Sequence, residues 1–482
     1  MTTDSGMGPG GSGSEGDVTD AEELPAGWLR ATLGELGVEV QPGFASGKHN
    51  RDGEGILHLR PMNITRNGVL DTLDARYVVD DSDRRVELGD VLFNNTNSPA
   101  LVGKTAWVDS AEPLAYSNHM TRLRGPEGLD GKFLAAQLHH MWVTGYFKSI
   151  LNNHVNQASV SRKALLDTVI VVPPLAEQHR IVAKLEEQLA NIETGEISLA
   201  DARSRIVDFV TSLLAEATKP SVEASNWETK TIGEMATVSS GATPLKGRAD
   251  YYDGGTVPWI TSSLLNAPFV DRAEKFITDR AVKETAVKEY PPGTLLLAMY
   301  GEGKTRGKCS ELRIHATTNQ ACAGIQLAAE YLCRKDWVKL VLEARYEENR
   351  ALASGGVQPN LSLGLVKKIE VPLPPLMRQK ELLEQVAQRR ADAGEMSDAI
   401  ESVKMQATEL RNALLHAAFT GTLVPQDSDD EPASVFLDRI RAERTAVVKQ
   451  TRRKRVSRTT SPAAPQTSGR PVPSGTQEAL PL

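Results

Sequence analysis

The sequence predicts an α+β protein in which two pseudo-repeated globular regions are separated by a long antiparallel two-helix coiled coil. Three observations lead to this prediction. A Pro-Pro-Leu-x-x-Gln motif occurs twice, with Gln178 and Gln379 lying 201 residues apart. Each copy opens a long apolar heptad pattern. Each copy also follows a region that mixes short β-rich runs with a helical pattern, which is the arrangement expected of one duplicated unit.

Both heptad patterns indicate long helices. Proline can open a helix because its missing N–H would be unpaired there in any case. Apolar spacings alternate between three and four from Val182 to Leu213 and from Leu382 to Ala417. These patterns far outlast the ~11 residues of an average helix, which favours a coiled-coil seam over a core-facing amphipathic helix. The first helix leads into the second globular region and the second leads away from it. They would therefore pack antiparallel, with the globular regions at opposite ends.

Three residues within the first helix stand out. Glu196 and Arg203 occupy seam positions, where polar side chains can fix the register or contact a partner. Gly195 lowers helix stability by ~1 kcal/mol relative to alanine, so a local weak point is expected there.

Composition sets further bounds. The chain has 482 residues, of which 40% are hydrophobic and 24% charged, as in a soluble protein of two or more domains. It lacks an 18-residue apolar run and a secretory signal, so we expect a cytoplasmic protein with no membrane partner. Cys309, Cys322 and Cys333 lack metal-site spacing and are expected to be reduced and half-buried. The net charge of -7 argues mildly against nucleic-acid binding if averaged, so local patches decide.

The chain divides into seven predicted segments. They are a disordered leader at 1–23, globular regions at 24–174 and 218–375, spacer helices at 175–217 and 376–418, a C-terminal segment at 419–450, and a disordered basic, proline-rich tail at 451–482. The globular regions should each contain one clear helix, from Lys132 to Phe147 and from Glu330 to Glu348. A short helix is expected from Ala433 to Lys449. The basic run that begins at Arg452 is either a phosphate-binding element or a solvated tail.

Common catalytic motifs do not occur. The sequence has no HExxH, no GxSxG, no Asp-Pro-Pro-Tyr-like methyltransferase element and no GxGxxG after a strand. We therefore predict no catalytic residue, no cofactor-binding residue and no metal ligand. The nearest approach is the loop from Ala298 to Thr305, which ends in Gly-Lys-Thr. A phosphate-binding loop needs glycine where Ala298 stands and a helix afterwards. A nucleotide-dependent or modifying enzyme acting through this loop is the alternative function.

The same loops fit DNA reading better. Asparagine and glutamine can pair bidentately with adenine, and arginine or lysine with guanine. Glycines let the backbone approach the phosphates, and serine and threonine hydroxyls and lysine position the duplex. The candidate DNA-binding residues are Asn94, Asn95, Thr96, Asn97, Ser98 and Lys104 in the first region, and Tyr300, Lys304, Arg306, Lys308, Asn319 and Gln320 in the second. Equivalent loops with different side chains would suit two domains that dock alike and read different sequences. Ordinary polar turns are the alternative, as is a coiled-coil scaffold that does not touch DNA.

With these motifs in place, the sequence resembles the specificity (S) subunits of type I restriction-modification enzymes. The resemblance covers roughly residues 24–450 and is carried by the paired Pro-Pro-Leu-x-x-Gln helices and by the stretches 92–105, 298–307, 316–321 and 418–434. It implies a non-catalytic subunit whose two target recognition domains each read one half of a split site in double-stranded DNA. The helices would set the spacing and dock two methyltransferase (M) subunits, which methylate adenine with S-adenosylmethionine. Restriction (R) subunits would add ATP-driven translocation and cleavage.

Overall fold

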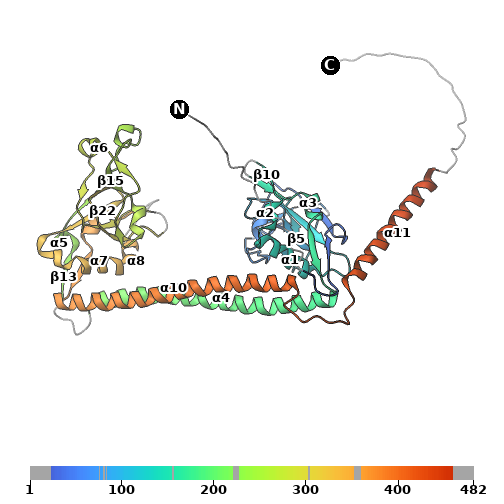
Figure 1. Ribbon diagram of the computed structural model, residues 1–482. Coiled ribbons are helices and arrows are strands. Elements are labelled where there is room, and N and C mark those ends of the chain that lie inside the picture. The colour runs from blue at the N-terminus through green and yellow to red at the C-terminus, as the bar shows by residue number, and fades with distance from the viewer. Residues whose placement is uncertain are drawn as a thin grey trace, which may run out of the picture. The chain divides into compact units, whose positions relative to one another are not determined.

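The structure is a computed structural model that describes residues 23–459 except 75, 80–81, 83, 155–156, 221–226, 302–303 and 352–359 (Figure 1). Of the predicted leader it therefore includes only Glu23, and of the predicted tail only the part up to Thr459. The chain forms two compact units. The first comprises Met1–Thr194 and Ala407–Leu482, and the second Gly195–Gln406. Each long helix thus contributes residues to both units. No helix among the described residues has the length and apolarity needed to span a membrane.

The first unit is built on a four-stranded antiparallel sheet of order β2-β9-β5-β7. Its strands are β2 (Glu39–Pro42), β5 (Val91–Asn94), β7 (Thr105–Trp107) and β9 (Met120–Arg124). A second sheet consists of β3 (Ile56–Leu59), β4 (Tyr77–Val78) and β8 (Ala115–Tyr116). Smaller sheets pair β1 (Leu29–Thr32) with β12 (Val169–Val172), and β6 (Thr96–Asn97) with β11 (Gln157–Ser159) and β10 (Asn152–His154). The helical elements are η1 (Pro61–Asn63), α1 (Gly131–Val143), α2 (Tyr146–Ser149) and α3 (Arg162–Leu166).

The second unit repeats this strand order. Its larger sheet has the order β14-β22-β19-β20-β16. These strands are β14 (Ala236–Ser240), β16 (Phe269–Val270), β19 (Leu295–Ala298), β20 (Cys309–Leu312) and β22 (Cys322–Leu327). The other sheets contain β13 (Glu228–Thr231), β15 (Val257–Ile260), β17 (Phe276–Ile277), β18 (Glu289–Tyr290), β21 (Ala316–Thr318) and β23 (Glu370–Leu373). The helical elements are α5 (Ile232–Met235), η2 (Ala249–Tyr251), η3 (Ser262–Asn266), α6 (Asp279–Glu284), η4 (Ala329–Arg334), α7 (Lys335–Ala344), α8 (Tyr346–Ala351) and α9 (Leu363–Lys367).

The two topologies confirm the predicted α+β pseudo-repeat. The order β2-β9-β5-β7 corresponds to β14-β22-β19-β20, and each unit also pairs its first and last strands, β1 with β12 and β13 with β23. Even the unusual parallel pairing recurs, between β3 and β8 and between β15 and β21. Because a parallel pair needs a long crossover connection, its recurrence at the same place indicates one duplicated fold.

The two long helices are α4 (Leu175–Thr218) and α10 (Leu376–Thr420), with 44 and 45 residues. Their starts match the prediction, and their ends lie one and two residues beyond it. In the first unit, the start of α4 (Ile181, Leu185) shares a core with the end of α10 (Leu415, Ala418, Phe419). In the second unit, the end of α4 shares a core with the start of α10. The contacts in both units therefore run antiparallel, as the heptad pattern predicts (Figure 1).

Two polar residues, Glu196 and Arg203, occupy seam positions of α4. The Arg203 guanidinium lies 2.7 Å from the Glu401 carboxylate of α10, in the second unit. Both side chains are more than half exposed, so this ion pair contributes at most about 1 kcal/mol. It can still favour the observed register. Glu196 is half-buried, and α4 continues through Gly195 without a break.

Several sequence-based predictions about local elements were wrong. The helix predicted from Lys132 to Phe147 is broken at Gly145, whose φ of 86° is a left-handed conformation that ends helices. The helix predicted from Glu330 to Glu348 is divided into η4, α7 and α8. Helix α11 runs from Ala433 to Thr459, so the backbone of the basic run is helical.

The cysteines also differ from the expectation of half-burial. Cys309 and Cys322 are fully buried and Cys333 is exposed, and all three are free thiols. Burial raises the pKa of the Cys322 thiol to about 12 and also raises that of Cys309. Two of the three thiols are thus inert core residues rather than reactive groups.

The C-terminal segment closes the core of the first unit. Ala433, Phe436, Leu437 and Ile440 of α11 are buried in the same cluster as Phe133. Polar contacts fix the approach to this helix. The Arg180 guanidinium lies 2.7 Å from the Asp430 carboxylate, and the Ala433 amide donates to the Gly27 carbonyl at 2.9 Å. The Phe436 ring covers Gly128, where a Cβ atom would lie 2.5 Å from the ring.

We expect the Phe436→Ala variant to destabilise the first unit by about 3–5 kcal/mol, because it removes a buried aromatic ring and leaves a cavity. Hydrogen exchange of the full chain measures this, with faster exchange expected in the strands of the first unit and unchanged exchange in those of the second. Val435→Ala is the matched control, because Val435 is 40% exposed on the same turn of α11. Unaltered protection of the first unit would contradict the role given to α11.

Candidate nucleic-acid interface

The two loops singled out by the sequence occupy equivalent places. The first loop, 94–104, starts at the last residue of β5, includes the short strand β6 and ends before β7. The second loop, 299–308, connects β19 to β20. Both strand pairs are antiparallel neighbours in the larger sheet of their unit. The loops therefore leave the same edge of the same fold, although their side chains differ.

The second loop is not a phosphate-binding loop of the nucleotide-hydrolysing kind. Such a loop is followed by a helix whose free N–H groups face the phosphate. Here the chain passes directly into β20, which pairs with β19 through Leu297 and Cys309. The alternative function proposed for this loop is therefore not favoured.

Two residues predicted to bind DNA through the first loop are buried. Asn94 is fully buried and donates from Nδ2 to the Leu101 carbonyl at 2.8 Å. Lys104 is 5% exposed, and its Nζ donates to the carbonyls of Pro61 and Ile64. Burial, together with the nearby Arg66, lowers the pKa of Lys104. Both predictions need correction, because these side chains brace the loop from inside. The sequence-based assumption that polar loop residues face solvent fails here.

The remaining residues of the first loop approach the surface. Asn95, Thr96 and Asn97 are half-buried, and Ser98 is exposed. The Asn97 Oδ1 accepts a hydrogen bond from the Ser98 amide at 2.8 Å, which forms a tight polar turn. The Asn95 amide donates to the His119 carbonyl at 3.0 Å. The turn that contains exposed Asn118 and half-buried His119 therefore lies beside the loop, and these two residues join the candidate interface.

The second loop has the same neighbour. The Met299 amide donates to the Ala321 carbonyl at 2.8 Å, so the turn with Asn319 and Gln320 lies against the start of the loop. The Asn319 Oδ1 accepts from the Ala321 amide at 3.1 Å, which shapes this turn. Gln320 is exposed and accepts a hydrogen bond from the Thr243 hydroxyl. The structure thus brings together two segments that the sequence predicted separately.

The candidate residues of the second loop differ in exposure. Lys304 is exposed, whereas Tyr300, Arg306 and Lys308 are half-buried. The Lys308 Nζ lies 4.4 Å from the centre of the Tyr346 ring, within the range of a cation–π interaction. Sequence analysis did not include Tyr346, which comes from α8. The signal available for Asn118 and His119 was their correspondence to Asn319 and Gln320, 201 residues further along the chain.

The chemistry of both surfaces suits recognition. Amides, hydroxyls and cations gather there, which are the groups that bind base edges and phosphates. Within the described part of the chain, no group of three or more His, Cys, Asp or Glu residues is placed to hold a metal ion. The arrangement can therefore read a polyanion by hydrogen bonding and charge.

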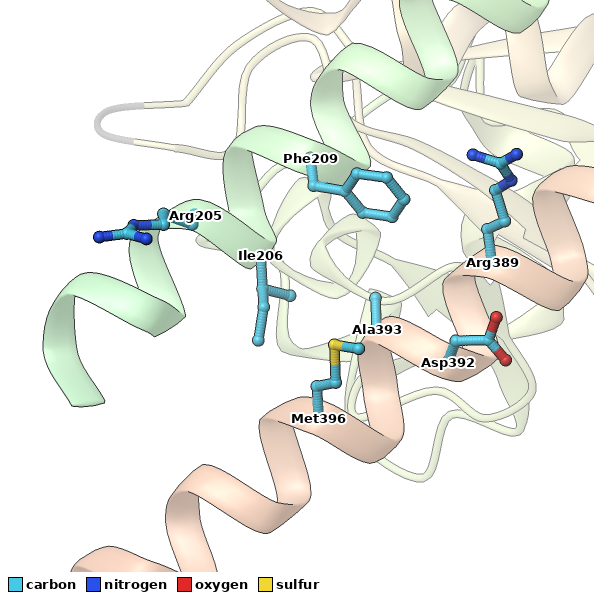
Figure 2. Close-up of a pocket in the computed structure, with 7 residues that line it drawn as sticks. All are labelled: Arg205, Ile206, Phe209, Arg389, Asp392, Ala393 and Met396. Carbon is cyan, nitrogen blue, oxygen red and sulfur yellow. The ribbon is translucent and has the colours of Figure 1, made fainter. Parts of the chain in front are cut away.

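A separate hollow lies on the helix pair of the second unit (Figure 2). Its volume is about 390 Å³, and it is lined by Arg205, Ile206, Phe209, Arg389, Asp392, Ala393 and Met396. Figure 2 shows the apolar side chains between α4 and α10, with Arg389 and Asp392 at one end. Phe209 is 45% exposed and Met396 59% exposed. Exposed apolar side chains gathered in one groove are typical of an interaction surface. We call this the spacer groove.

Comparisons with known proteins agree with this geometry. The family model described as type I restriction modification DNA specificity domain matches residues 27–199 and again residues 224–388. The StySPI specificity subunit of Salmonella potsdam is 21% identical over 88% of this chain and 96% of that protein. The EcoKI specificity subunit of Escherichia coli is 23% identical over 88% of this chain and 97% of that protein.

A further relative matches a third of this chain, and a chain of a solved structure aligns with most of it. The MjaIX specificity subunit of Methanocaldococcus jannaschii is 29% identical, but over only 33% of this chain and 36% of that protein. A chain in a solved structure of a type I R-M system aligns with a TM-score of 0.65 and 19% identity, covering 83% of this chain and 100% of that one. That alignment supports the fold. The repeated family match identifies the chain: it belongs to the type I restriction-modification specificity subunits and carries two target recognition domains.

Proposed function

We propose that this chain is the non-catalytic DNA-recognition subunit of a type I restriction-modification complex. In this proposal each target recognition domain reads one half of a bipartite site in double-stranded DNA. One observation carries it above the others. Two loops leave the same edge of the same duplicated fold, yet one presents amides and hydroxyls and the other presents cations. Equal scaffolds with unequal side chains suit two half-sites of different sequence.

Within the first domain, we assign reading to Asn95, Thr96, Asn97 and Ser98, together with the neighbouring turn at Asn118. The buried side chains of Asn94 and Lys104 are assigned a supporting role, because they hydrogen-bond backbone carbonyls and so fix the loop. Within the second domain, the assigned residues are Tyr300, Lys304, Arg306, Lys308, Asn319 and Gln320. Amide side chains favour adenine and cationic side chains favour guanine or phosphate. The two domains should therefore differ in the bases that they prefer.

The spacer helices are proposed to set the distance between the half-sites. Each is continuous over more than 40 residues, or about 66 Å at ~1.5 Å per residue. Both units contain seam contacts between α4 and α10, so neither helix is a free tether. The proposed boundaries are 24–174 and 218–375 for the recognition domains, and 175–217 and 376–418 for the spacer.

The proposed partners are two M subunits and, in the full complex, R subunits. The M subunits would supply S-adenosylmethionine-dependent adenine methylation, so the S subunit itself needs no cofactor. A complex that acts on DNA favours a cytoplasmic location for this chain.

The spacer groove is the proposed docking site of one M subunit. Its aromatic and thioether side chains offer an apolar anchor, and its charged rim offers orientation.

We expect that exchanging residues 218–375 for the equivalent domain of a related S subunit will change one half of the methylated site and preserve the other. The reason is that the contacts described for each loop are made within its own domain. Mapping methylated adenines in a host genome that carries the chimaeric complex measures both halves at once.

A change in both halves would contradict the modular assignment.

The unaltered complex tests DNA contact itself. Its affinity should fall as salt rises, because bound lysine and arginine side chains release counterions from phosphates. Salt-independent binding, or none, would favour a coiled-coil scaffold that does not touch DNA.

We expect Phe209→Asp to weaken assembly with the M subunit by about tenfold or more, because it puts a charge in the apolar centre of the spacer groove. Val207→Asp is the matched control, since Val207 is 60% exposed on the same helix but outside the groove. Titration of purified M subunit against each variant, by light scattering or calorimetry, gives the affinities. Equal losses for the two variants would exclude the groove as the docking site.

A further inference from the structure

Tyr346 contacts the second loop through both its hydroxyl and its ring. The hydroxyl donates to the Lys304 carbonyl at 2.6 Å. It also accepts a hydrogen bond from the Arg350 guanidinium at 2.8 Å. The ring carries the Lys308 Nζ over its face, 4.4 Å from the ring centre. One side chain therefore fixes the loop's backbone at Lys304 and one of its cations at Lys308.

Gly307 allows the loop to come this close. Its φ of 86° lies in the left-handed region, which favours glycine. A Cβ atom there would lie 3.1 Å from the Tyr346 carbonyl oxygen and 3.4 Å from a ring carbon of the same residue. Any larger residue would therefore push the loop away from α8. The contact with Tyr346 is part of how the loop is built.

The loop is also held on another side, and α8 itself is anchored. The Thr305 hydroxyl donates to the Asn266 Oδ1 of η3 at 3.3 Å. Asn349 of α8 is buried and donates to the Leu342 carbonyl of α7 at 3.3 Å. Helix α7 is in turn linked to the spacer, because the Arg390 guanidinium of α10 lies 2.7 Å from the Glu343 carboxylate. Contacts thus run from the spacer helix through α7 and α8 to the loop.

We infer that Tyr346 is a positioning and specificity-determining residue for DNA reading by the second recognition domain. This inference rests on the proposed function of the second loop. Its hydroxyl holds the Lys304 backbone, and its ring holds the Lys308 ammonium, so that the exposed Lys304 side chain is presented from one loop conformation. A site that reads base edges must be held to about 0.5 Å, and preorganisation lowers the entropy lost on binding.

The first domain uses a different device at the equivalent place. Gly103 also has a positive φ, of 98°, but it lies against the buried Phe147 ring. The Trp142 indole donates to the Ala100 carbonyl at 3.2 Å. These are mainly apolar core contacts, whereas the support from Tyr346 is polar and half-buried. Changing Tyr346 should therefore affect reading by one domain only and leave its core intact.

The test uses the full chain assembled with its M subunits and the Tyr346→Phe variant, which keeps the ring and removes the hydroxyl. DNA duplexes that carry single base changes in either half-site are compared with the cognate duplex for binding and methylation rate. We expect about fivefold weaker cognate binding, equivalent to one ordinary hydrogen bond, and a similar loss of discrimination in the half-site read by the second domain. Discrimination in the other half-site should not change. Tyr346→Ala, which also removes the ring beneath Lys308, should show a larger loss.

Two further variants make the result decisive. Tyr331→Phe is the matched control, because the Tyr331 hydroxyl accepts a hydrogen bond at 2.8 Å from the Nζ of Lys230, which belongs to β13 of the same unit and not to the loop. Lys304→Ala tests the loop itself. If Lys304→Ala alters reading but Tyr346→Phe does not, the role of Tyr346 is overturned while the proposed function stands. If neither alters it, the loop is not the reader. Equal losses for Tyr346→Phe and Tyr331→Phe, or at both half-sites, would also overturn the inference.

Discussion

The apolar seam between α4 and α10 is the contact on which both units depend, because it is also part of their cores. Ile181 and Leu185 of α4 are buried in the same cluster as Phe133 of α1 and Phe419 of α10. Leu214 of α4 and Val386 of α10 belong to the core that includes Trp337 of α7. Burial of such side chains contributes about 1.5–3 kcal/mol each. Weakening the seam would therefore also loosen the domains that carry the proposed DNA-reading loops.

Polar contacts also join the long helices to each domain. The Trp28 indole donates to the Glu177 carboxylate at 2.9 Å, and the Gln178 side chain accepts from the Asp130 amide at the start of α1. Arg390 and Glu343 link α10 to α7 in the second unit. Each recognition domain is thereby fixed to a spacer helix near the element that supports its loop. The domains keep one scaffold and differ at the loop, as the first is braced by buried Lys104 and Phe147 and the second by Tyr346.

Sequence reasoning succeeded where a pattern repeats over a long stretch. The paired Pro-Pro-Leu-x-x-Gln motifs and the heptads located the ends of α4 and α10 to within two residues, because seam spacing is a local property of the chain. It failed where tertiary surroundings decide. Nothing local shows that the Lys104 ammonium reaches the carbonyls of Pro61 and Ile64, or that Gly145 takes a left-handed conformation that ends α1. The sequence also did not predict the spacer groove. Phe209 lies outside the heptad positions, and Met396 occupies a heptad position but is exposed.

We propose that the α4–α10 pair fixes the distance between the two DNA-reading domains. The most direct measurement inserts one heptad into each helix at facing positions and maps the methylated sites of the resulting complex. Seven residues add about 10.5 Å of helix, which matches about three base pairs of DNA at ~3.4 Å per pair. We predict that both half-site sequences persist while the gap between them grows by about three base pairs. An active complex that keeps the original gap would contradict the account.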